Sequence, residues 1–215
     1  AIIGPIQKAR ILESLGADAL ITLRFDQQLA NLSPEQFVVD HLMPIRAKLV
    51  LVGQGFRFGH KGSGSIIELR QLGERFGFEA KEIPTVVSGD LPVSSTEIRK
   101  AIASGNIKAA NSMLGRNHQT EGMVEHGRKI GRKIGFPTAN LARDSEGLLP
   151  IDGVYAGWLF ADGVRYPAAH SVGTNDSIEA VPRLLESHVI GRDDLDLYDK
   201  IVTCEYVEQV RPWAK

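Results

Sequence analysis

The fold of the first half of the chain is decided by residues 48–59, which read KLVLVGQGFRFG. Residues 48–52 form a near-continuous apolar run, which predicts a strand that is covered on both faces. The glycine-rich residues 53–59 follow at once, so the strand should end in a loop where the backbone can approach a ligand closely. Strands of this kind are covered by helices, and the flanking sequence supplies helical patterns.

Helix and strand patterns alternate on both sides of this stretch. Helices are predicted at residues 8–15, 34–45, 66–76 and from Ser94 onward, and further strands at 19–23 and 78–83. Two of the helices begin with capping signals, at residues 33–36 (SPEQ) and 94–97 (SSTE). The alternation predicts an α/β domain with a parallel sheet that is wound right-handedly.

Strand-length runs replace the helical spacing after Gly115-Arg116. They lie at residues 123–124, 154–160, 166–172, 184–190 and 201–210, separated by Gly, Asp and Asn. Several short strands at this spacing predict an antiparallel barrel or sandwich. We therefore predict two domains, residues 1–116 and 117–215.

The composition excludes several classes of protein. The 215 residues carry 25 Lys and Arg against 26 Asp and Glu, and this net charge of −1 argues against a general nucleic-acid or anionic-membrane binder. No apolar run approaches the ~20 residues that span a bilayer. The single Cys204 excludes an intramolecular disulfide and a cysteine metal cluster. We predict a cytoplasmic protein with no nucleic-acid or membrane partner, and the sequence leaves its oligomeric state open.

Two loops of the first half are candidate ligand sites, because ligands bind beyond the carboxyl ends of parallel strands. In the first loop, Phe56, Phe58 and Gly59 are candidates to wall a base or a ring; the alternative is a surface loop with two aromatics in the core. In the second, Ser95 and Thr96 open a helix, and Arg99 follows one turn on. Free amides, hydroxyls and a guanidinium suit a phosphate, although a plain helix cap with an exposed arginine remains possible.

Residues 127–140 (GRKIGRKIGFPTAN) are the candidate phosphate loop of the second half. Gly131 and Gly135 stand between cations, so amides and basic side chains can converge on a polyphosphate. Thr138 and Asn140 carry hard oxygen ligands that suit Mg²⁺ beside phosphates. A solvated basic turn is the alternative, but it does not explain the FPTAN segment.

These segments resemble the prokaryotic bifunctional riboflavin kinase/FMN adenylyltransferase family, also called FAD synthetase. The resemblance is collinear over nearly all of the chain and rests on SPEQF, LVGQGFRFG, VSSTEIR, LGR, GRKIGFPTANL, DGVYAGW, SVGTN and ESHVIGRDDLDLYDK. It implies a Rossmann-like adenylyltransferase domain followed by a six-stranded antiparallel kinase barrel. The implied activity is ATP-dependent phosphorylation of riboflavin to FMN, then adenylylation of FMN to FAD, with Mg²⁺ as cofactor.

The resemblance also implies roles for single residues. Glu186 matches the family's catalytic base, expected on a strand edge at the barrel mouth, where its carboxylate can accept the proton of the substrate hydroxyl. Thr138 and Asn140 match the ligands of the Mg²⁺–nucleotide, and Ser95, Thr96 and Arg99 match the phosphate-contacting motif of the adenylyltransferase. Without the resemblance, Glu186 reads as a surface glutamate with Glu179, Glu205 and Glu208 as competitors.

Three features depart from the family pattern. The six histidines form no HxGH pair, Gly55 stands where Asp or Asn is usual, and Asp176-Ser177 follows SVGTN in place of a Pro-Thr-Phe-Gly turn. Residue 1 aligns part-way into the family's first domain, and the family's C-terminal helix is missing after residue 215, so we expect the sequence to omit segments. The alternatives are a riboflavin kinase with a degenerate first domain and a non-catalytic flavin-binding regulatory module.

Overall fold

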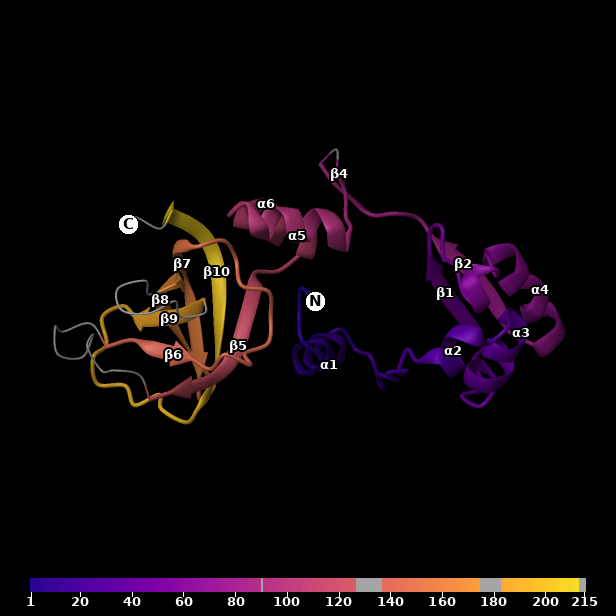
Figure 1. Cartoon of the computed structure of the whole chain (residues 1–215), viewed down its shortest axis with the longest axis horizontal. Helices are drawn as coiled ribbons and strands as arrows, with labels where there is room; N and C mark the ends of the chain where they lie inside the picture. Colours follow the sequence, from indigo (N-terminus) through magenta and orange to yellow (C-terminus); the bar gives the residue numbers. More distant parts are fainter. Residues whose placement is uncertain (90, 127–136, 175–182, 213–215) are drawn as a thin grey trace. The chain divides into compact units, whose positions relative to one another are not determined.

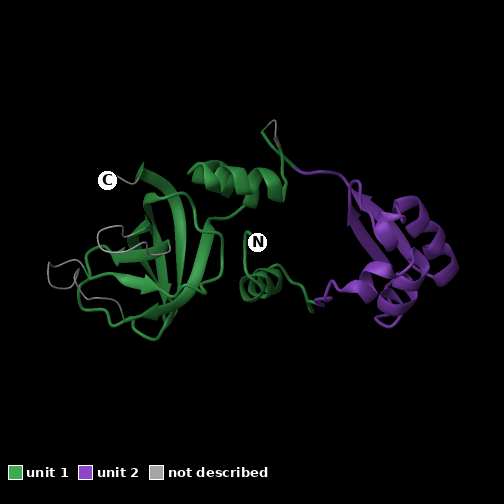
Figure 2. Ribbon diagram, viewed as in Figure 1, with its two compact units in different colours: residues 1–20, 87–215 green, residues 21–86 purple. Residues whose placement is uncertain are grey.

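The computed structural model describes residues 1–89, 91–126, 137–174 and 183–212. The chain divides into two compact units, one formed by residues 21–86 and the other by residues 1–20 together with 87–215 (Figures 1 and 2). Within the described residues, no helix is long and apolar enough to cross a membrane.

The smaller unit, residues 21–86, is built around a βαβ motif. Strands β1 (Leu49–Gly53) and β2 (Glu79–Ile83) pair in parallel, and α4 (Ile66–Phe76) connects them. The remaining elements are α2 (Gln27–Asn31), α3 (Pro34–Phe37), the π-helical turn η1 (Val38–Leu42) and the 3₁₀ turn η2 (His60–Gly62). The predicted capping box at Ser33 is present, because its hydroxyl accepts from the Gln36 amide and the Gln36 side chain accepts from the Ser33 amide. The parallel α/β prediction is thus confirmed.

Two strand predictions in this unit are wrong in detail. Residues 17–26 carry no helix or strand, although residues 19–23 were expected to form one. Strand β1 was expected to be covered on both faces, yet Leu49 and Leu51 are 47% and 54% exposed while Val52 lies in the core. The reason is the same in both cases: the described residues supply only two strands to this sheet, so one face of β1 and the run at 19–23 have no neighbour to pack on.

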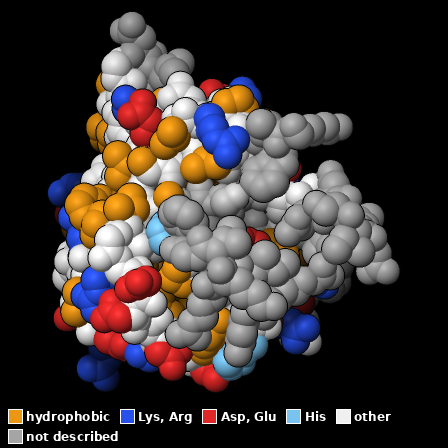
Figure 3. Space-filling view, turned by 90° about the vertical axis from the view of Figure 1, so that its left-hand side faces the viewer, with side chains coloured by type: hydrophobic (Ala, Val, Ile, Leu, Met, Phe, Trp, Pro, Cys, Tyr) orange, Lys and Arg blue, Asp and Glu red, His pale blue; other side chains and the backbone are white. Residues whose placement is uncertain are grey.

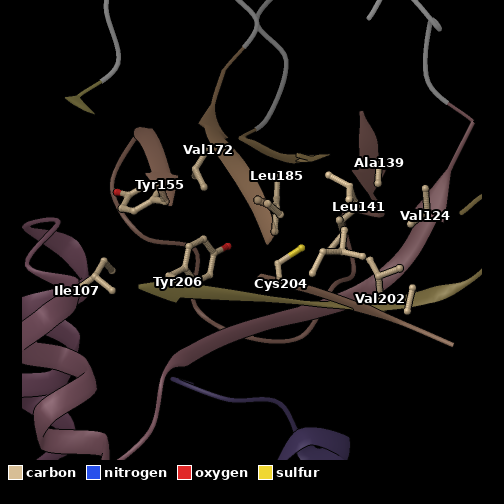
Figure 4. Packing of buried hydrophobic residues seen from close by; sticks show 14 residues of the cluster. Ile107, Val124, Ala139, Leu141, Tyr155, Val172, Leu185, Val202, Cys204 and Tyr206 are labelled. Carbon is tan, nitrogen blue, oxygen red and sulfur yellow. The ribbon is translucent and has the colours of Figure 1, made fainter. Parts of the chain in front are cut away.

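The larger unit contains a closed six-stranded antiparallel barrel, as the sequence predicted. Its strands are β5 (His118–Glu125), β6 (Ala139–Leu141), β7 (Gly153–Ala161), β8 (Val164–Gly173), β9 (Leu184–Val189) and β10 (Ile201–Pro212), in the order β10-β5-β6-β9-β8-β7. Alternate residues of each strand point inward and fill the barrel. Figure 4 shows Tyr155, Leu185, Cys204 and Tyr206 meeting in this core. The burial of Cys204 agrees with its reading as a small hydrophobic residue.

Three helices and a small hairpin complete this unit. These elements are α1 (Pro5–Ser14), α5 (Ser95–Ala103), α6 (Ile107–Leu114) and the pair β3 (Val87–Ser88) and β4 (Leu91–Pro92). Helix α1 docks on the barrel through Arg10, whose guanidinium makes two hydrogen bonds to the buried carboxylate of Glu121. The Glu146 carboxylate accepts from backbone amides in the first turn of α1, where a negative charge complements the helix dipole.

Candidate functional site

The centre of the candidate site is a pair of side chains on the outer face of the barrel. Asn140 on β6 lies directly opposite Glu186 on β9, and Glu186 in turn lies opposite Ser171 on β8. Directly opposed residues on one face have Cβ atoms about 4.5–5.5 Å apart. The sequence neighbours Leu185 and Ser187 are buried in the barrel, so Glu186 and Asn140 face outward. The pairing of β6 with β9 therefore brings together two candidates that are 46 positions apart in the sequence.

The environment of Glu186 favours a basic carboxylate. Its side chain is half-buried, and this burial raises the pKa of the carboxyl group above its usual value. Among the described residues, its carboxylate has no hydrogen-bond or ion-pair partner. The structure places Glu186 on the outer face of β9, three residues before the end of that strand.

The competing glutamates have structural partners instead. Glu205 accepts a hydrogen bond from the Gln119 side chain at 2.7 Å and pairs with Arg165 at 3.3 Å. Glu208 pairs with Lys108 at 2.7 Å. The third competitor, Glu179, lies outside the described residues.

A pocket opens beside Asn140, at the end of the barrel where β9 and β5 finish, and Glu186 is not among the residues that line it. It has about 580 Å³ of space, including a part that is open to solvent. Apolar and polar groups both contribute to its wall. The lining residues are Val124, Pro137, Thr138, Ala139, Asn140, Ser187, Val189, Arg192, Leu195, Leu197 and Tyr198. Figure 3 shows one face of the molecule, on which hydrophobic side chains lie among acidic, basic and histidine ones.

Thr138 and Asn140 stand at the rim of this pocket, and their chemistry fits Mg²⁺. The amide nitrogen of Asn140 donates to the Thr138 carbonyl at 3.4 Å, which leaves the amide oxygen of Asn140 available as an acceptor. Neutral oxygen ligands of this kind suit a Mg²⁺ ion that keeps waters and phosphate oxygens as its other ligands. Among the described residues, no group of three His, Cys, Asp or Glu side chains could hold a metal by itself.

The remaining sequence candidates lie elsewhere. Gly131 and Gly135 are outside the described residues. Phe58 is buried in the core of the smaller unit and stacks on Phe56 at 5.6 Å, as in the packing alternative. Gly59 has a φ of +73° and packs on Pro34, so this position requires glycine for its backbone conformation. A ligand role for Phe56, Phe58 and Gly59 stays a prediction.

The motif around Arg99 forms the start of α5 in the larger unit. Ser94 is the cap, since its hydroxyl accepts from the Glu97 amide at 3.2 Å. Ser95 and Thr96 occupy the first turn with exposed side chains, and the exposed Arg99 guanidinium reaches the Thr96 hydroxyl at 3.5 Å. The Arg99 and Thr96 side chains are close enough to contact one phosphate, while the hydrogen bonds by themselves describe a capped helix.

Sequence reasoning missed most of the pocket wall. Arg192, Leu195, Leu197 and Tyr198 come from the segment after β9, and their only signal was the ESHVIGRDDLDLYDK match, in which no role was assigned to them. Arg192 forms a two-bond ion pair with Asp194, at 2.6 and 2.8 Å. The ring of Tyr198 stacks on His126 with 4.2 Å between centroids.

Two family models match the chain, each over a different part of it. Residues 114–215 match the riboflavin kinase family model, and residues 2–97 match the FAD synthetase model. The bifunctional riboflavin kinase/FMN adenylyltransferase of Escherichia coli K12 is 33% identical over 207 residues, which cover 95% of this chain. This chain belongs to the riboflavin kinase/FMN adenylyltransferase family. The family's kinase part is the barrel with the Asn140–Glu186 pair, and its FAD synthetase part is the α/β region.

A second curated relative and a solved structure are also similar to this chain. The bifunctional enzyme of Listeria monocytogenes is 36% identical over 168 residues, or 78% of this chain. A crystal structure from Streptococcus pneumoniae, described as a macrolide-efflux protein, superposes with a TM-score of 0.88 at 31% identity, covering 100% of this chain and 69% of its own. The chain spans 66% of the length of the Escherichia coli relative and 53% of the Listeria one.

Proposed function

We propose that this chain is a riboflavin kinase, which transfers the γ-phosphoryl group of ATP to the ribityl 5′-hydroxyl of riboflavin and releases FMN. The observation that carries the proposal is the placement of Glu186 directly opposite Asn140, which lines the pocket together with Thr138. Phosphoryl transfer needs a nucleotide site, charge stabilisation and a group that positions the attacking hydroxyl. These three parts would meet at the rim of this pocket.

Each part is assigned to residues of the chain. The apolar part of the pocket wall, which includes Val189 and Leu195, suits the adenine ring of ATP. Thr138 and Asn140 would hold the Mg²⁺–nucleotide at the rim, and Gly131 and Gly135 would wrap its phosphates. Bound Mg²⁺ would supply neutralisation of the charge on the transferred phosphoryl group.

Glu186 is the proposed base. Its carboxylate would accept a hydrogen bond from the ribityl hydroxyl, orient it and take its proton as the new O–P bond forms. A general base works best when its pKa is near the working pH, and burial moves the pKa of Glu186 in that direction. The γ-phosphoryl group goes to the hydroxyl oxygen, and ADP leaves.

FMN adenylylation is the second proposed activity. In this reaction the FMN phosphate attacks the α-phosphorus of ATP, so that FAD forms and pyrophosphate leaves. The match of residues 2–97 to the FAD synthetase model favours it, and the first turn of α5 offers Ser95, Thr96 and Arg99 to a phosphate. We place the border between the two activities at residues 116 and 117, just before β5, although residues 1–20 and 87–116 pack with the barrel. Riboflavin, FMN and ATP are the proposed partners, and we propose a cytoplasmic location.

Incubation of the chain with riboflavin, ATP and MgCl₂, followed by chromatographic separation of the flavins, tests both activities. We expect FMN to form only when ATP is present, and Glu186→Gln to abolish most of it. Glu208→Gln is the matched control, because it makes the same change at an exposed glutamate of the barrel. FMN without FAD would identify a kinase alone. Riboflavin that binds but stays unmodified would refute the proposal in favour of a flavin-binding module.

A further inference from the structure

His188 makes a contact that the proposed reaction does not yet explain. It lies on β9 two residues after Glu186, so both side chains point to the outer face of the barrel. Its Nδ1 atom is 2.9 Å from the carbonyl oxygen of Pro137. A carbonyl oxygen can only accept, so the imidazole carries its proton on Nδ1 and donates it to Pro137.

The position of this hydrogen bond in the sheet is informative. In the β6–β9 ladder, Asn140 lies opposite Glu186 and Ala139 lies opposite Ser187. One step further, the same register would place Thr138 opposite His188, but β6 begins only at Ala139. The bond from His188 therefore continues the ladder through a side chain and ties down the peptide just before Thr138.

The residue opposite His188 on β8 has a small side chain. On its other side, His188 lies opposite Ala169 of β8, which is one of the smallest side chains. The ring is partly buried, so its hydrogen bond to Pro137 is partly shielded from water. Proline has no amide hydrogen that could pair in the ladder. If the bond from His188 is lost, the hydrogen bond that remains for Thr138 among the described residues is the weak one from the Asn140 amide to its carbonyl, at 3.4 Å.

We propose that His188 is a positioning residue that fixes Thr138 for nucleotide binding. This proposal rests on the proposed kinase function. Glu186 and His188 are neighbours on one face of one strand, so β9 would set the place of the base directly and the place of Thr138 through Pro137. The two sides of the phosphoryl transfer are then held in a common register.

The test compares three substitutions at this position. Asparagine can place an amide hydrogen where His188 holds Nδ1–H, glutamine carries its amide one bond too far, and leucine has the shape of asparagine but no donor. We expect His188→Leu and His188→Gln to raise the KM for ATP and weaken ADP binding by roughly 2- to 12-fold, the range for one net hydrogen bond. His188→Asn should restore most of this loss, while riboflavin affinity stays within error of the wild type.

A double-mutant cycle with Thr138→Ala completes the test. If His188 acts through Thr138, His188→Leu should cost little more once the threonine hydroxyl is gone. Additive losses of ADP affinity in the cycle, or equal ADP affinities of the Asn, Gln and Leu variants, would overturn the inference about His188. The proposed kinase function would still stand if the wild type makes FMN. A wild type that binds no ADP in calorimetry and makes no FMN would overturn both. Calorimetry with ADP also gives a readout that does not depend on turnover.

Discussion

Acidification from pH 7 to pH 5 should destabilise the barrel, because two of its histidines are buried as neutral rings. His118 and His170 have no exposed surface. The His118 ring donates to the Leu148 carbonyl at 2.6 Å, and the His170 ring lies 2.9 Å from the Ser187 hydroxyl and 3.0 Å from the Glu205 carbonyl. Burial lowers the pKa of each of the two rings to about 4.

The size of the effect follows from these two pKa values. In the unfolded chain a histidine takes up its proton near pH 6.5, whereas the native rings stay neutral down to about pH 4. The unfolded state therefore binds more protons, and the free energy of unfolding falls as the pH drops from 6.5 to 4. Each ring costs roughly 2 kcal/mol by pH 5, so the pair costs roughly 4 kcal/mol. That is a large part of the ~5–15 kcal/mol of a typical domain.

Urea denaturation at several pH values between 7 and 5, monitored by tryptophan fluorescence, measures this loss of stability. The fluorescence reports on the barrel half of the chain, because both tryptophans lie after residue 150. Glu186 works in the opposite direction, because its raised pKa lets the native state take up a proton, so the series is best run in the Glu186→Gln background. His118→Gln and His170→Gln should each remove about half of the loss, and the double variant nearly all of it. A stability that is flat over this range, or a double variant that still loses about 4 kcal/mol, would refute the reasoning.

Four further outcomes are expected. Glu186→Gln should lower kcat for FMN formation by roughly 10²–10⁴-fold with little change in riboflavin affinity, and the loose transition state of phosphoryl transfer favours the low end of this range. The same substitution should raise the thermal midpoint at pH 7, because it removes a half-buried charge. An unchanged kcat would place the base elsewhere. Thr138→Ala should abolish most kinase turnover with the fold intact, and near wild-type FMN formation would exclude it as a metal ligand. Arg99→Ala should impair FAD formation but spare FMN formation, with partial rescue by lysine, whereas equal damage to both would indicate misfolding. Arg10→Ala should destabilise the unit by about 1–3 kcal/mol in urea denaturation, because the buried Glu121 carboxylate loses its two-bond partner; no loss would mean that α1 is not held by this pair.

Local signals in the sequence predicted several helix starts well, but they wrongly predicted a strand at residues 19–23. The Ser33 capping box, the helix at 66–76 and the Ser94 cap are all formed where the sequence indicated them, because a cap depends on residues within one turn. The run at 19–23 has the composition of a strand but pairs with nothing. A strand is stable only when a neighbour completes its hydrogen bonds, and composition carries no information about that neighbour.

The candidate site divides in the same way. The sequence by itself determined which groups are available: the oxygens of Thr138 and Asn140, the Glu186 carboxylate, and the alternation that sends it to the opposite face from Leu185. Only the tertiary structure decided that β6 pairs with β9 in the register that sets Asn140 opposite Glu186, and that His188 reaches Pro137. Strand register is a long-range choice, fixed when the inward residues of six strands fill one barrel together, so no single segment of the sequence encodes it.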